Sequence, residues 1–354
     1  MSRCLVCVIY DGIYHSVFAG QVLVPLLKRL ELDNNLWVCL VSFEKKLYSP
    51  EQLRGVIGFH PRLTVVIVKR YSFWGAYSLL PAVFRLRKIL KSIGTYSITA
   101  RGPLAGWIVR HAINRKLCTE IIIQSRGLVA EEYRYAHRGA RGISRLIHAL
   151  RARWYYGVER SVYGVPIEGV LFSIEVVSAA LQDYLVGHFG TKNSWCTQAE
   201  FDVPARIEKN LVAAWRASVR SQLGIDLQTS VYCFTGAAKS WQCPELIADY
   251  FGQLQKKNRA IFFLVLTSDV EKFSALLGEV LLPKSYIVLT VNYQEIYRYL
   301  SAADVGIILR EPGMVSWIAR PVKAMEYEAV GLKVIHNNTV DWLIKRFGKI
   351  IIEP

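Results

Sequence analysis

The order of elements in residues 299–335 constrains the fold more than any other feature of the sequence. Val305 to Leu309 is an apolar run that predicts a buried strand, and residues 310–321 contain the Gly and Pro of a loop. Residues 322–330 then have the pattern of a helix, and a second strand opens at Val334. In an open α/β sheet such a loop lies at the carboxyl end of a parallel strand, where ligands bind. We therefore expect the chemistry of the chain near residues 310–321.

The same alternation of strand and helix runs through both halves of the chain. Helices are expected over Pro50–Gly58 and from Ser173, as an N-cap, to Leu185, and from Thr229 the alternation restarts. Strands joined by helices of this length require right-handed crossovers and a parallel sheet. The apolar runs that predict strands in the first half are Leu5–Tyr10, Leu36–Val41, Leu63–Val68 and Gly169–Phe172.

A chain of 354 residues is long enough for two domains of this kind. We predict an α/β protein with a Rossmann-like domain over residues 1–201 and a second over residues 229–354, joined by a linker and helix over residues 202–228.

Residues 299–335 contain YLSAADVGI and then P-x-K-x-x-E-Y-x-x-x-G-L-x-V-I, which begins at Pro321. This pair of motifs resembles the nucleotide-sugar half of glycosyltransferase family 4, whose members are retaining enzymes with the GT-B fold. The resemblance implies two Rossmann-like domains with parallel sheets that face a central cleft, the second holding the nucleotide sugar and the first the acceptor. Ile318 stands where many members have the first Glu of an E-x7-E motif. The residues that match a branch of the family are Arg310, Glu311, Pro312, Ser316, Pro321, Lys323, Glu326 and Tyr327.

The resemblance also implies roles for these residues. Glu326 is expected to hold the donor ribose, Glu311 to take part in catalysis, and Arg310, Ser316 and Lys323 to contact the donor.

Glycine-containing turns at Gly12 and Gly236 correspond to places where the family binds the donor diphosphate, with Lys239 beside the second. A plain turn glycine is the alternative at Gly12. The G-x-G-x-x-G spacing of dinucleotide binders is absent, which argues against a dehydrogenase.

Two Arg-Gly pairs, Arg101-Gly102 and Arg126-Gly127, each follow an extended segment. The resemblance implies that their loops face the sugar, and an arginine there would stabilise negative charge on the leaving diphosphate. A turn without catalytic function is the alternative.

The positive charge of the chain is concentrated in its first half. The formal net charge is +16, and residues 1–200 contribute 26 − 13 = +13 of it, against 18 − 15 = +3 from residues 201–354. Anionic lipid, pyrophosphate carriers and nucleic acid all fit a basic surface. We expect contact with a membrane rather than with nucleic acid.

Two cationic stretches are candidates for such contacts. In residues 71–94, Trp74, Tyr77 and Phe84 precede a basic helix, which is typical of an interfacial contact, although a helix packed on the sheet is an equal alternative. In residues 134–160 the apolar positions have helical spacing, and we expect that face to pack on its own domain, leaving the arginines for an anionic acceptor.

The seven cysteines lie mostly in apolar runs, as expected of reduced core residues. Cys4 and Cys7 form a C-x-x-C inside a predicted strand without a second ligand pair, so no metal is expected. No signal peptide or spanning segment is evident. We expect a cytoplasmic protein, membrane-associated at most, and a chain that ends without the terminal helices usual in the family.

The predicted function is therefore metal-independent, retaining transfer of a sugar from a nucleotide sugar, UDP- or GDP-linked, to a saccharide or lipid-linked acceptor. Biosynthesis of a cell-surface polysaccharide or lipopolysaccharide fits this reaction, and no other cofactor is implied. One alternative is a catalytically degenerate GT-B scaffold or regulatory protein, which Ile318 favours. A nucleic-acid-binding protein is favoured by charge alone.

Overall fold

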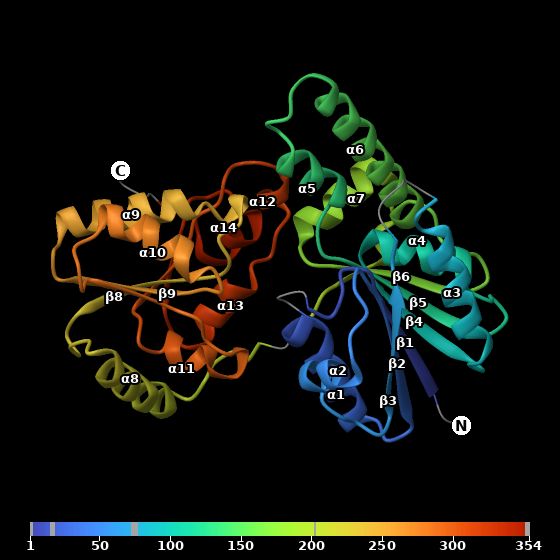
Figure 1. The fold of residues 1–354 in the computed structure, drawn as a ribbon, viewed down its shortest axis with the longest axis horizontal. Helices are drawn as coiled ribbons and strands as arrows, with labels where there is room; N and C mark the ends of the chain where they lie inside the picture. The colour runs from blue at the N-terminus through green and yellow to red at the C-terminus, as the bar shows by residue number, and fades with distance from the viewer. Residues whose placement is uncertain (1–2, 15–17, 72–76, 202, 351–354) are drawn as a thin grey trace. The chain divides into compact units, whose positions relative to one another are not determined.

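The computed structural model describes residues 3–14, 18–71, 77–201 and 203–350. The chain divides into two compact units, Met1–Asp202 and Val203–Pro354. Each unit is built on its own parallel sheet with helices packed against it (Figure 1). The units are called unit 1 and unit 2 below.

Unit 1 has a seven-stranded sheet in the order β3-β2-β1-β4-β5-β6-β7, and every pairing is parallel. The strand order reverses between β1 and β4, so right-handed crossovers place the early and late helices on opposite faces. The strands are β1 (Arg3–Ile9), β2 (Leu36–Glu44), β3 (Leu63–Lys69), β4 (Tyr96–Arg101), β5 (Cys118–Ser125), β6 (Leu171–Val176) and β7 (Cys196–Gln198).

A π-helical turn opens the first crossover helix of unit 1, and α1 and α2 pack together over β1 to β3. On the other face α3, α4 and α6 pack in sequence. The helices are η1 (Ala19–Leu23), α1 (Val24–Leu32), α2 (Pro50–Ile57), α3 (Leu80–Lys91), α4 (Gly102–Ala112), α5 (Val129–Ala136), α6 (Gly142–Tyr163), α7 (Ala179–Phe189) and η2 (Asn193–Trp195).

Unit 2 has a five-stranded parallel sheet in the order β10-β9-β8-β11-β12, so its order reverses between β8 and β11. Apolar side chains fill both faces of this sheet. The strands are β8 (Ser230–Thr235), β9 (Ile261–Leu266), β10 (Tyr286–Leu289), β11 (Val305–Ile308) and β12 (Lys333–His336).

Helix α8, which the sequence analysis assigned to the linker, belongs to unit 2. Its Val219 joins the apolar cluster on one face of the sheet, and its fully buried Arg220 binds the carbonyl of Ala302 and the carboxylate of Asp304. The helices of unit 2 are α8 (Lys209–Leu223), η3 (Ser240–Gln242), α9 (Pro244–Lys257), α10 (Val270–Val280), η4 (Tyr293–Glu295), α11 (Ile296–Leu300), α12 (Met314–Trp317), α13 (Val322–Ala329) and α14 (Asp341–Phe347).

Three local predictions were wrong. Ser173 lies inside β6, and Ser178 caps the following helix by accepting a hydrogen bond from the backbone N–H of Leu181 at 3.1 Å. The loop after β11 contains the short helix α12. The apolar face at the start of α6 is exposed rather than packed on its domain.

None of the helices in the described ranges is long and apolar enough to cross a membrane.

Candidate functional site

The reversal point of the unit 2 sheet brings Gly236 and Lys323 together. Gly236 follows β8 with φ +135°, and a Cβ there would lie 3.0 Å from the Lys323 Nζ and 2.5 Å from the Gln242 Oε1. Lys323, in the first turn of α13, donates to that Gln242 oxygen at 2.6 Å, and its Nζ lies 4.2 Å from the centroid of the Phe234 ring. The positive φ favours glycine at this position, and a side chain there would have to displace the Gln242 amide.

The surroundings of Lys323 disfavour the charged form of its side chain when no anion is bound. Burial is the largest cause that lowers the pKa of Lys323 well below its ordinary value, and Arg310 lowers it further, while Glu326 raises it. A bound phosphate would reverse this balance, because it supplies an opposite charge beside the ammonium group. The cradle of Gly236, Gln242 and Lys323 therefore has the chemistry of an anion site.

Glu326 lies one turn further along α13 and is buried, with 9% of its surface exposed. Burial raises the pKa of this carboxyl to about 7, and Lys323 lowers it. Its neighbour Tyr327 is fully buried, and the Tyr327 hydroxyl accepts a hydrogen bond from the backbone N–H of Thr235 at 3.0 Å. Tyr327 thus ties α13 to the end of β8 and fixes the position of Glu326 relative to Gly236.

The loop after β11 is held by its neighbours. The backbone N–H of Arg310 donates to the Asn337 side chain at 3.1 Å, and the Asn337 amide donates back to the Arg310 carbonyl at 2.6 Å. The Cys243 thiol hydrogen-bonds to the backbone of Glu311. Ser316 is buried within α12. The loops after β8 and β11 therefore meet at the carboxyl edge of the sheet.

Lys239 is placed differently from Lys323. It is exposed, and its Nζ lies 5.2 Å from the ring centroid of Trp241. The cation beside the Gly236 turn is Lys323, which is partly buried.

In unit 1 the turn after β1 contains Gly12, whose φ is +90°. A Cβ there would lie 2.5 Å from a carboxylate oxygen of Glu44, at the end of β2. The other oxygen of Glu44 accepts hydrogen bonds from the backbone N–H of Ile13 at 2.7 Å and from the Ser42 hydroxyl. A carboxylate therefore fills the position that an anion would take at this turn.

Arg101 ends β4 and is 8% exposed. Its Nη2 donates to the Gln21 Oε1 at 2.6 Å, and its buried Nη1 has no hydrogen-bond partner among the described residues. Burial lowers the pKa of this guanidinium. Donor groups of this kind are what an incoming polar ligand satisfies.

Arg126 follows β5 and donates to the Glu175 carboxylate at 2.7 Å. The Gln124 amide donates to the same oxygen at 3.2 Å, and the guanidinium carbon of Arg126 lies 5.4 Å from the Phe201 ring centroid. These side chains line a cavity of about 460 Å³ at the carboxyl ends of β5 to β7. Its other lining residues are Gly20, Gln21, Pro25, Lys28, Arg29, Leu32, Gln198 and Glu200.

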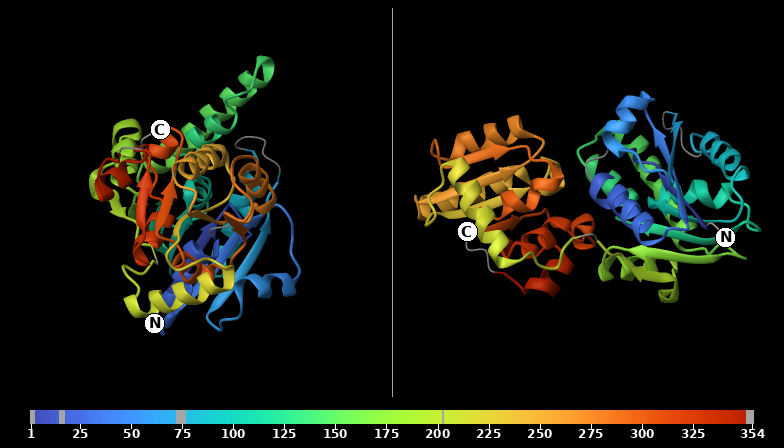
Figure 2. Two further views of the ribbon diagram at one scale, coloured as in Figure 1. Left: turned by 90° about the vertical axis from the view of Figure 1, so that its left-hand side faces the viewer. Right: turned by 90° about the horizontal axis from the view of Figure 1, so that it is seen from below.

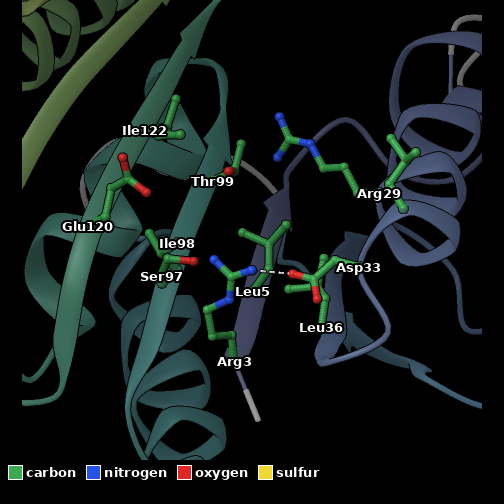
Figure 3. Close-up of a pocket in the computed structure, with 11 residues that line it drawn as sticks. Arg3, Leu5, Arg29, Asp33, Leu36, Ser97, Ile98, Thr99, Glu120 and Ile122 are labelled. Carbon is green, nitrogen blue, oxygen red and sulfur yellow. Dashed lines mark hydrogen bonds and ion pairs between the residues drawn. The ribbon is translucent and has the colours of Figure 1, made fainter. Parts of the chain in front are cut away.

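A second cavity of about 310 Å³ lies at the opposite, amino-terminal edge of the unit 1 sheet. Figure 3 shows Arg29 of α1 on one side of it, Glu120 of β5 on the other and the ion pair between Arg3 and Asp33 below. Ligands of open α/β sheets bind at the carboxyl edge. We assign this cavity no part in the chemistry.

Within the described parts of the chain no group of three or more His, Cys, Asp or Glu side chains is placed to hold a metal ion.

No protein-family profile matches the chain, and no curated protein matches it. Solved structures do. WaaG, a glycosyltransferase involved in lipopolysaccharide biosynthesis, superposes with a TM-score of 0.66 at 12% identity, over 99% of this chain and 86% of that one. The chain has the GT-B fold. A glycosyltransferase from Rickettsia africae ESF-5 gives a TM-score of 0.62 at 10% identity, over 98% of this chain and 82% of that one.

A UDP-forming trehalose-phosphate synthase from Burkholderia xenovorans, in complex with glucose-6-phosphate, gives a TM-score of 0.59 at 9% identity, over 99% of this chain and 88% of that one. At these sequence identities, the similarity to solved structures shows the fold of the chain alone.

Several polar residues at the candidate sites of the two units of the GT-B chain were missed by the sequence analysis. They come from strand ends and from short π- and 3-10 helices without a motif, so only the tertiary fold reveals them. They are Gln21, Glu44, Glu175, Gln198 and Gln242.

Proposed function

We propose that the protein is a retaining, metal-independent glycosyltransferase that moves a sugar from a nucleotide sugar to a saccharide or lipid-linked saccharide. The observation that carries this proposal is the cradle of Gly236, Gln242 and Lys323 beside the buried carboxyl of Glu326, at the reversal point of the unit 2 sheet. Similar folds in known glycosyltransferases support the reaction class.

In this proposal the donor diphosphate binds at the Gly236 turn. Lys323, aided by Arg310, neutralises the charge that develops on the diphosphate as the bond to the sugar breaks, so a fixed cation does the work of a divalent metal. Glu326 accepts hydrogen bonds from the ribose hydroxyls, for which a buried carboxylate is well suited. Ser316 and Glu311, from the neighbouring loop, contact the transferred sugar.

Lys239 and Gly12 receive smaller roles. Lys239 is exposed over Trp241, so we place it at the rim of the donor site. The Glu44 carboxylate beside Gly12 repels a diphosphate, and we therefore assign Gly12 a structural role in the turn.

The acceptor binds in unit 1, in the cavity lined by Arg126 and Glu175. Its amides, carboxylates and guanidinium groups offer both donors and acceptors to sugar hydroxyls, and Phe201 offers an apolar ring. Arg101 donates to Gln21, which lines the same cavity, and the Arg101 Nη1 has no hydrogen-bond partner among the described residues. We propose that the acceptor belongs to a cell-surface polysaccharide or lipopolysaccharide-type pathway and is met at the cytoplasmic face of a membrane.

A catalytically degenerate scaffold is the second candidate, and Ile318 favours it. The side chain at this position is apolar and 2% exposed, whereas a sugar-binding carboxylate is the common residue in the resembled family. The two candidates differ in whether the protein binds nucleotide.

Calorimetric titration with UDP, GDP and ADP tests the proposal. UDP is titrated first because one structural neighbour is UDP-forming. We expect one nucleotide to bind and Glu326→Ala to lose about 1.5–3 kcal/mol of binding free energy, roughly 10- to 150-fold in Kd. The control is Glu328→Ala, because Glu328 lies on the same helix but pairs with Arg346.

Binding that Glu326→Ala leaves unchanged removes this residue from the ribose site. If none of the three nucleotides binds, the degenerate scaffold is the better account. Transfer itself is then measured with the sugar donors of the nucleotide that binds.

A further inference from the structure

The first half of α6 carries an apolar stripe that no part of the described chain covers. Ile143, Leu146, Ile147 and Leu150 are 80%, 62%, 52% and 62% exposed. Their spacing of three and four residues places them on one face of the helix. Singly exposed aliphatic residues are ordinary, but four on one helix face form a patch that calls for a partner.

The stripe lies away from the neighbouring helix. Helix α5 contacts α6 through the Tyr133 hydroxyl, which lies 2.7 Å from the His148 Nδ1, and His137 stacks on His148. His148 lies on a different face of the helix from Leu146 and Leu150. In the left view of Figure 2 the first half of α6, in green, projects away from the sheet of unit 1.

The charge around the stripe has one sign. From Tyr133 to Val158 the chain contains six arginines and no Asp or Glu. Arg151 and Arg153 follow the stripe directly, and helical geometry places them on its two flanks. Aliphatic residues flanked by long cationic side chains match a lipid interface, because the stems lie along the acyl boundary while the guanidinium groups meet anionic headgroups.

We propose that the first half of α6 docks the protein on an anionic lipid surface, with Ile143, Leu146, Ile147 and Leu150 inserted among the headgroups. A protein partner fits less well, since protein interfaces are depleted of unpaired charge at their centre and this surface would need an acidic partner along both flanks. The docking gives a transferase with a lipid-linked acceptor access to its substrate. The claim that docking gives access to a lipid-linked acceptor rests on the proposed function, whereas the proposal of lipid binding does not.

The sequence analysis offered residues 71–94 as a membrane contact, with a helix packed on the sheet as an equal alternative. Part of that stretch, residues 72–76, lies outside the described residues. Helix α3 does expose Phe84, and Arg87 lies over its ring at 5.9 Å, but Arg87 also donates to the carbonyl of His111. The opposite face of α3 is packed on unit 1. The longer uncovered stripe is on α6.

Co-sedimentation with vesicles tests the proposal on the full chain. Wild-type protein is mixed at low salt with vesicles of phosphatidylcholine alone and of phosphatidylcholine with phosphatidylglycerol. We expect binding to the anionic vesicles, at least about tenfold weaker partitioning of Leu146→Ser/Leu150→Ser, and weaker binding of Arg153→Gln, which removes an exposed cation from one flank of the stripe. The control is Leu227→Ser/Leu246→Ser, which replaces two exposed leucines of unit 2 and should bind as wild type.

Two results overturn the proposal: no binding of wild type to anionic vesicles, or equal binding by Leu146→Ser/Leu150→Ser. Sedimentation velocity without lipid tests for a third such result. If the wild type is a dimer and Leu146→Ser/Leu150→Ser is a monomer, the stripe is a contact between copies of the chain. Circular dichroism and thermal denaturation of the same variant show that it is folded, independently of nucleotide binding. Vesicle binding without nucleotide binding means that the proposed function fails while the membrane surface stands.

Discussion

Replacing Lys323 by methionine should raise the thermal stability of the protein while it weakens donor binding. Methionine keeps most of the length of the side chain but removes the ammonium group, which lies over the Phe234 ring and whose pKa is lowered mainly by burial. Replacing a desolvated charge with an apolar side chain of similar volume is neutral or stabilising, and we take about 1–2 kcal/mol here. For a folding unit of the size of unit 2, residues 203–354, that corresponds to a rise in Tm of roughly 2–8 °C.

The same change should weaken nucleotide binding. Loss of one charged hydrogen bond to the diphosphate costs about 1.5–3 kcal/mol, so Kd for the nucleoside diphosphate should rise roughly 10- to 150-fold. Calorimetry with the diphosphate and with its parent nucleoside localises the effect, because only the diphosphate contacts Lys323. The control is Lys333→Met, which changes an exposed lysine of β12. A lower Tm together with unchanged diphosphate affinity would refute the anion site.

Three further substitutions have defined consequences. Gly306→Ala would place a Cβ 2.2 Å from the ring of Tyr327, so we expect about 1–3 kcal/mol of destabilisation in urea and weaker nucleotide binding. Arg220→Leu removes the donor to the carbonyls of Ala302, Asp226, Leu227 and Thr229, whereas Asp304 keeps its ion pair with Arg216, so thermal denaturation should show a loss of about 1–3 kcal/mol. The carboxyl pKa of Glu326 is raised by burial from 4.5 to about 7, so the folded state retains a proton that the unfolded state releases. The free energy of unfolding should therefore fall as pH rises from 4.5 to 7, and Glu326→Gln should flatten that fall.

The strand and helix positions near the candidate donor site could be predicted from the sequence, because the apolar run and the helical pattern there agree with the fold. The apolar run at Val305 and the helix pattern from Val322 became β11 and α13. Their order placed the loop between them at the carboxyl edge of the sheet. The resemblance selected Lys323 and Glu326, and both lie there.

Other features required the tertiary structure. Helical spacing showed that Ile143 and Leu150 share a face, but spacing does not state what covers that face, and the prediction that unit 1 covers it was wrong. Ser173 has a side chain typical of a helix N-cap, but it lies in β6, where it pairs with Ile122 of β5. Gln242 belongs to no motif, and only the approach of α13 to the loop after β8 reveals its bond to Lys323.

The two units have equivalent first turns with opposite electrostatics. Each sheet has a glycine with positive φ after its first strand, Gly12 after β1 and Gly236 after β8. At Gly12 the space that a side chain would occupy is taken by the carboxylate of Glu44, and at Gly236 it is taken by the Gln242 amide and the ammonium of Lys323. A diphosphate would be repelled by the carboxylate at the first turn and attracted by the ammonium group at the second. Under the proposed function, the residue that contacts the turn, and not the turn itself, therefore decides which unit receives the donor.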